Sequence, residues 1–286
     1  MIVDNKSYKE QIDSFVEAIP ELSVTASQVV EICSRIDSTP EELSQVVSED
    51  SVLSEHVLKL VNSAYYSLVS EVTSLTRAIT MLGFNTVKSI TLSKAVNKAV
   101  ARLNFPQILP MDGFWRHSIS TGVAAGMLSR VKQGSTTQRE DFLICGLLHD
   151  LGKMAFVESY TEVISLSEHT QITPVEAERE LYGFDHQQVG LKIARKWQFN
   201  DTIRNCIGFH HEVDRSEEVD KIQTAFLALG DVYANIYDLG YAGNFYPSET
   251  ELNNLLSLTG VSWAEFRSIG KDIEAEVLKA GVFLQL

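Results

Sequence analysis

Apolar residues recur along this chain at the spacing of an α-helix. Between residues 74 and 82 they lie three or four positions apart, at Leu75, Ala78, Ile79 and Leu82, and Gly83 ends the segment. Such spacing places apolar side chains on one face of a helix. The chain has no run of alternating β-branched residues and no hairpin dipeptide between two such runs. The pattern predicts an all-α fold, a multi-helical bundle of roughly twelve or more helices.

Several helix ends can be read directly from the sequence. Thr39-Pro40-Glu41-Glu42 and Thr173-Pro174-Val175-Glu176 each combine a capping threonine, a proline in the first helical position and a glutamate two residues later. This arrangement is typical of a helix start. Asp185 can cap a helix that runs from His186 towards Trp197, and Gly183 ends the helix before it.

The best candidate for a boundary is the segment 104–112, which contains Pro106 and Pro110. Two prolines stop the preceding helix, and a new helix is expected to start near Asp112. The chain is thus predicted to contain an N-terminal helical subdomain, residues 1–105, and a C-terminal helical subdomain, residues 106–286. The connection is short and apolar, so the two are expected to pack together. Polar loops are predicted at 131–141 and 238–250.

Composition and charge limit the function classes. Of the 286 residues, 44% are apolar and 22% charged, as in water-soluble globular proteins. The formal charge of −14 repels phosphate backbones, which argues against general nucleic-acid binding. A small phosphate-containing ligand held by a local metal ion or lysine remains compatible with this charge.

The cysteines and the N-terminus bear on the compartment. Cys33, Cys145 and Cys206 lie in apolar helical patterns without a CxxC pair, which favours buried reduced thiols. The first ten residues show no basic region followed by an apolar stretch, and no apolar run approaches the ~18 residues that span a bilayer. We expect a cytoplasmic protein that does not bind membranes.

Candidate chemistry lies in histidine and aspartate residues that close or interrupt apolar helices. His149-Asp150 ends the apolar segment 142–148, and His210-His211 ends the segment 203–209. Asp231 interrupts the apolar segment 226–230. A buried carboxylate is costly unless it is paired or bound to a metal ion, so packing alone explains these doublets poorly.

Two more histidines could join them. His117 shares a helix face with small and apolar residues, and His186 lies in the first turn of its helix. A single helical histidine is more often an ordinary core or surface residue than a ligand, and we assign His56 and His169 to that class. Neutral imidazoles with carboxylates suit a borderline transition metal such as Fe, Mn, Zn, Ni or Co.

The order His117, His149-Asp150, Asp231 resembles the H…HD…D signature of the HD superfamily of metal-dependent phosphohydrolases. Together with Lys153, His186 and His210-His211, the pattern is similar to the fuller set in HD-GYP cyclic di-GMP phosphodiesterases. That resemblance implies a two-metal site with a lysine that contacts substrate phosphate. The chain departs from the pattern in two places. Val213-Asp214-Arg215-Ser216 follows Glu212 without a Gly-Tyr-Pro element, and Gly113 stands where some of those enzymes carry a glutamate.

The N-terminal part resembles a narrower family, the HDOD domain (HD-related output domain). The similarity lies in the segments 19–22, 49–53, 57–66 and 74–83, and 114–118 continues it. The resemblance covers about residues 15–240. It implies an all-helical bundle of HD type in bacterial signal transduction, in a family whose members have often lost the metal ligands. This chain has kept them.

Two functions follow as expectations. One is metal-assisted hydrolysis of a phosphodiester or nucleotide, with Asp150 and Lys153 as catalytic residues. The other is a non-catalytic regulatory module that binds a signalling protein partner and whose metal site is structural or vestigial. The implied cofactor is one or two divalent transition-metal ions, Fe, Mn, Ni or Zn. The predicted metal ligands are His117, His149, Asp150, His186, His210, His211 and Asp231.

Overall fold

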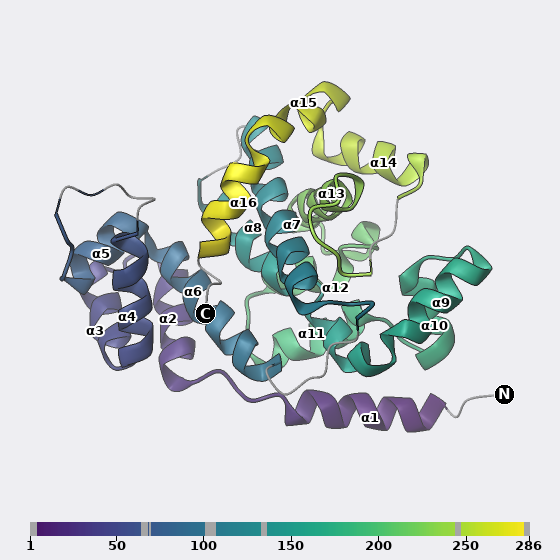
Figure 1. Ribbon diagram of the computed structural model, residues 1–286, viewed down its shortest axis with the longest axis horizontal. Coiled ribbons are helices and arrows are strands. Elements are labelled where there is room, and N and C mark those ends of the chain that lie inside the picture. The colour runs from purple at the N-terminus through teal and green to yellow at the C-terminus, as the bar shows by residue number, and fades with distance from the viewer. Residues whose placement is uncertain are drawn as a thin grey trace. The chain divides into compact units, whose positions relative to one another are not determined.

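The computed structural model describes residues 5–63, 68, 70–100, 107–132, 136–243 and 247–282 (Figure 1). Throughout these residues the regular elements are helices, with no strand, and the predicted all-α class is confirmed. The chain forms two compact units. The larger unit comprises Met1–Pro20 and Arg102–Val277, and the smaller unit comprises Glu21–Ala101 and Leu278–Leu286.

The smaller unit is built from five consecutive helices around an apolar core. They are α2 (Val24–Ser34), α3 (Pro40–Ser48), α4 (Ser51–Val61), α5 (Leu75–Leu82) and α6 (Phe84–Val100). Leu43, Val57 and Ile79 are fully buried in this core. The Thr39 hydroxyl accepts a hydrogen bond from the backbone N–H of Glu42, and Gly83 ends α5 with a φ of 82°. The predicted starts and stops are therefore confirmed.

The larger unit holds the remaining helices. They are α1 (Asn5–Ala18), α7 (Met111–Val131), α8 (Thr136–Leu148), α9 (Tyr160–Thr170), α10 (Pro174–Tyr182), α11 (His186–Lys196), α12 (Asp201–Phe209), α13 (Lys221–Ile236), α14 (Glu249–Thr259), α15 (Trp263–Ser268) and the start of α16 (Ile273–Val282), with 3-10 helices η2 (Leu151–Ser159), η3 (Val213–Arg215) and η4 (Ile269–Lys271). The long helices α7, α8 and α13 form its centre (Figure 1).

The predicted helix ends around α10 and α11 are also confirmed. Thr173 and Glu176 form a capping box at the start of α10, and Gly183 ends that helix in the left-handed conformation. The Asp185 carboxylate accepts a hydrogen bond from the backbone N–H of Gln188 and caps α11. Because α11 begins at His186, this cap fixes where that imidazole leaves the helix.

One loop prediction is wrong and another is largely confirmed. The segment 131–141 was expected to be a loop, but α7 continues to Val131 and α8 already begins at Thr136. Polar residues suit the first turn of a helix, where backbone N–H groups lack partners within the helix. Between α13 and α14 the described residues, 237–243 and 247–248, are irregular, with positive φ at Asp238, Gly240 and Gly243. In the predicted boundary segment, residues 104–106 lie outside the described residues, and α7 begins at Met111.

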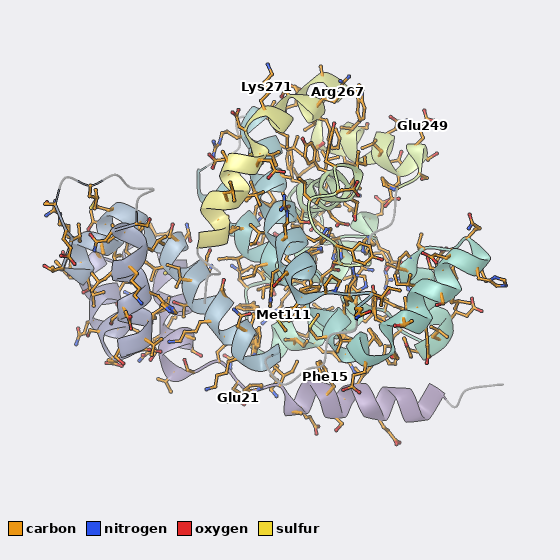
Figure 2. All side chains as sticks on the ribbon, viewed as in Figure 1. Phe15, Glu21, Met111, Glu249, Arg267 and Lys271 are labelled. Carbon is orange, nitrogen blue, oxygen red and sulfur yellow. The ribbon has the colours of Figure 1, made fainter. Side chains whose placement is uncertain are left out.

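Helix α1 is attached to α11 at its carboxyl end. The Lys196 ammonium donates hydrogen bonds to the carbonyl oxygens of Val16, Glu17 and Ile19. The Trp197 indole N–H donates to the carbonyl of Pro20 at 3.0 Å. A lysine at a helix C-terminus satisfies carbonyls that have no partner within the helix. The first helix of the chain therefore belongs to the larger unit, and Figure 2 labels Phe15 near this attachment.

Helices α7 and α8 cross at a pair of glycines. A Cβ atom on Gly146 would overlap the backbone of Gly122, and one on Gly122 would lie 2.6 Å from the carbonyl oxygen of Phe142. Backbone atoms cannot move aside as a flexible side chain can. The close approach of these two helices therefore requires glycine at both positions. None of the described helices is both long and apolar enough to cross a membrane.

We expect Gly146→Ala to lower the free energy of unfolding by about 1–3 kcal/mol, because the added methyl group forces the two helices apart. Urea denaturation measures the change. Gly281→Ala in α16 is the matched control, since its Cβ would meet no described atom within 4 Å, and it should leave stability unchanged or slightly raised. Equal stability of the two variants would contradict the proposed role of the glycine crossing.

Candidate metal centre

The structure brings together all seven side chains that the sequence predicted as ligands. His117 comes from the middle of α7, His149 and Asp150 from the turn after α8, His186 from the start of α11, His210 and His211 from the end of α12, and Asp231 from α13. Six of them expose less than a tenth of their surface, and His211 is partly buried. That these residues bind metal remains a prediction.

The cluster consists of two groups that share Asp150. In each group the ligand-type atoms lie within 4.8 Å of one another. The first group is His117, His149 and Asp150, and the second is Asp150, His186, His210 and His211. The shared aspartate divides its two oxygens between them.

Distances to Asp150 show this division. Its Oδ2 lies 3.4 Å from Nε2 of His149 and 3.8 Å from Nε2 of His117. Its Oδ1 lies 3.2 Å from Nε2 of His186 and 3.9 Å from Nε2 of His210. Asp231 completes the first group, since its Oδ1 is 2.9 Å from Nε2 of His117. The arrangement is that of two adjacent cation sites with one carboxylate between them.

Acceptors behind the imidazoles define which nitrogen faces the cluster. Nδ1 of His149 lies 2.7 Å from the Gly146 carbonyl oxygen, and Nδ1 of His210 lies 3.0 Å from that of Ile207. A carbonyl oxygen can only accept, so we assign the proton to Nδ1 in both rings. In the neutral rings, the Nε2 atoms then present lone pairs to the centre. This outer hydrogen bond is the usual companion of a metal-bound histidine.

The third such imidazole is His186. Its Nδ1 lies 2.7 Å from Oε2 of Glu178, and its backbone N–H donates to the same oxygen. Its Nε2 is 3.2 Å from Nε2 of His210. With both Nδ1 atoms directed at acceptors outside the cluster, the two Nε2 atoms face each other across a gap that either a shared proton or a cation can bridge.

Unsatisfied atoms test whether a metal ion fits. Nε2 of His149 and Oδ1 of Asp150 are buried without a hydrogen-bond partner among the residues the structure describes. Each unsatisfied buried acceptor costs about 1–3 kcal/mol. Both atoms face the cluster and are ordinary ligands of a divalent transition metal. The donor set therefore fits one or two such ions.

Protonation also favours a cation at the centre. Burial and the neighbouring His211 hold the pKa of His210 well below its usual range, and burial with His186 lowers the pKa of His211 to about 3. Burial opposes ionisation of Asp150, yet the charges of His149 and Lys153 hold the pKa of this carboxyl well below its usual range. Two neutral imidazoles and an ionised carboxylate are the forms that bind metal ions. Burial opposes protonation of His149, yet Asp150 and Asp231 raise the pKa of this imidazole, so it must release a proton when an ion binds.

Glu178 and Tyr160 belong to the site but were not predicted from the sequence. Glu178 is fully buried, accepts from His186 on one oxygen and accepts from the Tyr160 hydroxyl on the other, at 3.3 Å. Glu178 lies on the buried face of α10 with Val175 and Tyr182. An acid within an apolar stripe was the signal that could have found it.

Lys153 is buried beside the cluster, with 6% of its surface exposed. Its ammonium donates to Oδ2 of Asp150 at 2.6 Å and to the Ala242 carbonyl at 2.7 Å. An ammonium has three protons, so one is left for a ligand. Lys153 also lines a cavity of about 350 Å³ that reaches His117, His186, His211 and Asp231. This size suits a small organic ligand.

His56 lies in the smaller unit, and His169 lies at the exposed end of α9. Neither belongs to the metal-type groups found among the described residues. Their assignment as ordinary residues stays a prediction.

The chain matches one known protein family and is similar to one curated relative. A model described as the HDOD domain matches residues 19–213, more than half of the chain. An uncharacterized protein from Treponema pallidum (strain Nichols) is 24% identical over 237 residues, which are 79% of this chain and 44% of that protein. The chain thus spans less than half the length of this curated relative.

Solved structures show the same fold. An HDOD domain protein of unknown function from Geobacter sulfurreducens has a TM-score of 0.76 at 21% identity, with 99% of this chain and 100% of that chain covered. A predicted phosphohydrolase from Shewanella amazonensis SB2B has a TM-score of 0.70 at 22% identity, with 96% and 98% covered. A predicted signal transduction protein from Marinobacter aquaeolei VT8 has a TM-score of 0.76 at 19% identity, with 99% and 67% covered.

We expect the purified protein to contain one or two transition-metal ions per chain and Asp150→Asn to lose most of them. The substitution keeps the shape of the side chain but removes the shared negative charge. Elemental analysis after metal-supplemented expression measures the content. Asp214→Asn, at an exposed position in the same unit, is the control and should retain the metal. Less than roughly a tenth of an ion in the unchanged protein would refute a metal centre.

Glu178→Gln should weaken binding of the ion beside His186 by about 10–100-fold, because the anionic acceptor that orients the imidazole is lost. Competition with a chromophoric chelator measures the affinity. Glu180→Gln makes the same change at an exposed position of α10 and should have no effect. If both variants bind metal equally well, Glu178 does not support a ligand.

Proposed function

Because the chain belongs to the HDOD domain family, we propose that it is a signal-transduction protein with a hydrolytic activity. The histidine–aspartate cluster would hydrolyse a phosphoester, which is either a phosphodiester or a nucleotide. One observation carries this proposal. Two groups of ligand-type atoms share Asp150 and open into a cavity that has Lys153 in its wall. A purely structural metal site would need neither the cavity nor the lysine.

The types of ligand indicate which metal ions the site would bind. His117, His149, Asp150 and Asp231 would hold one ion, and Asp150 with His186, His210 and His211 would hold the other. Imidazole and carboxylate ligands suit Fe, Mn, Ni or Zn. When bound, such ions supply a water molecule of lowered pKa and neutralise phosphoryl oxygens.

The protein's own residues supply the positioning. Asp150 fixes the spacing of the two groups, since each of its oxygens faces one of them. Two of the three N–H groups of the Lys153 ammonium bond to Asp150 and Ala242. The third N–H would donate to a phosphoryl oxygen in the cavity. A new P–O bond forms to the water oxygen, the P–O bond to the leaving oxygen breaks, and the proton that the water loses ends on that oxygen to give the alcohol. The negative charge that develops on the phosphoryl oxygens lies next to the ammonium.

The signalling role rests on the family and on the division of labour in the chain. The described part of the smaller unit contributes no residue to the cluster. We propose that this unit binds a signalling protein partner, while the larger unit carries the chemistry. A small phosphate-containing molecule is the second partner. Neither nucleic acid nor a membrane is proposed, given the net charge of −14.

Lys153→Met should reduce turnover by about 10²–10³-fold while most of the metal is retained, because all seven predicted ligands remain and the lost ammonium is the group that would bind the phosphate. Release of the alcohol from a panel of phosphodiesters and nucleotides, assayed on metal-loaded protein, measures turnover. Lys192→Met, which breaks a partly exposed ion pair with Asp13 away from the cluster, is the control and should retain activity. A metal-loaded protein that is inert towards the whole panel would favour the non-catalytic regulatory module instead.

A further inference from the structure

The residues that line the cavity beside the cluster differ in burial and in charge. We call the wall formed by the cluster and Lys153, which are mostly buried, the inner part. The wall that includes the more exposed residues Glu176, Arg179, Glu212 and Glu251 we call the outer part. Two divalent ions would outweigh the carboxylates of the inner part and make it positive. The outer wall has three carboxylates and one guanidinium, so it is negative.

The single cation of the outer wall is already neutralised. The Arg179 guanidinium forms ion pairs with Asp185 and, at 2.9 Å, with Glu212. Glu212 is also paired with Arg215 at 2.7 Å. Arg179 thus has little charge to offer a second anionic group of a ligand.

Among the described residues, the outer carboxylates Glu176 and Glu251 have no ion pair, and Glu176 is engaged by Thr173 in the capping box of α10. Glu251 is partly buried at the start of α14, and no lysine, arginine or histidine pairs with it among the residues the structure describes. Burial and the nearby Asp231 both raise the pKa of this carboxyl. Its charge is therefore uncompensated within the protein, and a positive group in the cavity would stabilise it.

Asn235 lines the same cavity beside Asp231 of the cluster and has an unused acceptor. It is 7% exposed, and its amide nitrogen donates to Oδ1 of Asp231 at 3.1 Å. Because a carboxylate can only accept, the amide oxygen must be the other terminal atom. That oxygen is buried and has no donor among the described residues. The cavity lining thus includes one charged residue, Glu251, that lacks an ion pair, and one neutral residue, Asn235, whose amide oxygen lacks a donor.

We propose that the outer part of the cavity binds a cationic amino group, and that the substrate is a phosphoester with a single phosphate at one end and this amino group at the other. The inference rests on the proposed function, which places the phosphate at the cluster. An ammonium supplies both the positive charge for Glu251 and the hydrogen bond for Asn235. A polyphosphate would place further negative charge against the carboxylates of the outer wall and should be rejected.

Two phosphoesters of similar size and opposite terminal charge test the proposal. Phosphoethanolamine ends in an ammonium group, and phosphoglycolate ends in a carboxylate. Inorganic phosphate serves as the probe of the inner part alone. Binding of each to the full-length, metal-loaded protein is measured by titration calorimetry, which does not depend on turnover. We expect phosphoethanolamine to bind at least about tenfold more tightly than phosphoglycolate.

A charge-neutralising variant locates the effect. Glu251→Gln should weaken the binding of phosphoethanolamine and strengthen the binding of phosphoglycolate. The ratio of the two affinities should therefore fall by about fivefold. General damage to the fold would weaken the binding of both phosphoesters. Glu249→Gln makes the same change in the first turn of the same helix, at an exposed residue outside the cavity wall, and should keep the ratio (Figure 2).

The outcomes separate the two proposals. If inorganic phosphate does not bind the metal-loaded protein, the proposed function fails and the inference falls with it. If phosphate binds but phosphoglycolate binds as tightly as phosphoethanolamine, the inference is overturned and the proposed function stands. An unchanged ratio in Glu251→Gln would also overturn it, because the selectivity would not come from this wall.

Discussion

The larger unit is organised around the burial of one carboxylate. Asp150 is 1% exposed, and its charge is surrounded by imidazoles and by the Lys153 ammonium. A charge in this position is unfavourable unless its partners are held at close range. Those partners come from η2 and from the ends of α8, α11 and α12, so these elements must converge on one point. The fold can be understood as the arrangement of helices that makes this convergence possible.

Convergence requires the backbones to approach closely. The Gly122–Gly146 crossing brings α7 and α8 together, and Gly152 packs against the backbone at His186, where a Cβ would overlap a carbonyl oxygen. The loop after α13 joins the same network. Gly240, at a φ of 100°, lies against the backbone of His117, and Ala242 accepts from Lys153. The glycines therefore serve the site indirectly, because they place backbone where a side chain would hold the ligands apart.

Sequence patterns predicted the features whose causes are local. Helix caps depend on residues three apart, and the His149-Asp150 doublet stands out because it closes an apolar helix. The role of Glu178 depends on where α10 lies relative to α11, which no local pattern contains. The attachment of α1 through Lys196 likewise joins residues about 180 positions apart, and it could not be predicted from either segment alone. The helix start at Thr136 was missed because polar residues suit loops and first helical turns equally well.

The same constraint explains why the site and the stability of the unit cannot be separated. The unsatisfied buried atoms of His149 and Asp150 are costs of the fold that a bound cation would remove. A metal ion that satisfies these atoms stabilises the folded state by its binding free energy, since the unfolded chain holds no comparable set of ligands. Substitutions that loosen the helices around Asp150 should therefore weaken metal binding as well as folding. A partner that shifts those helices would act on the site through the same linkage.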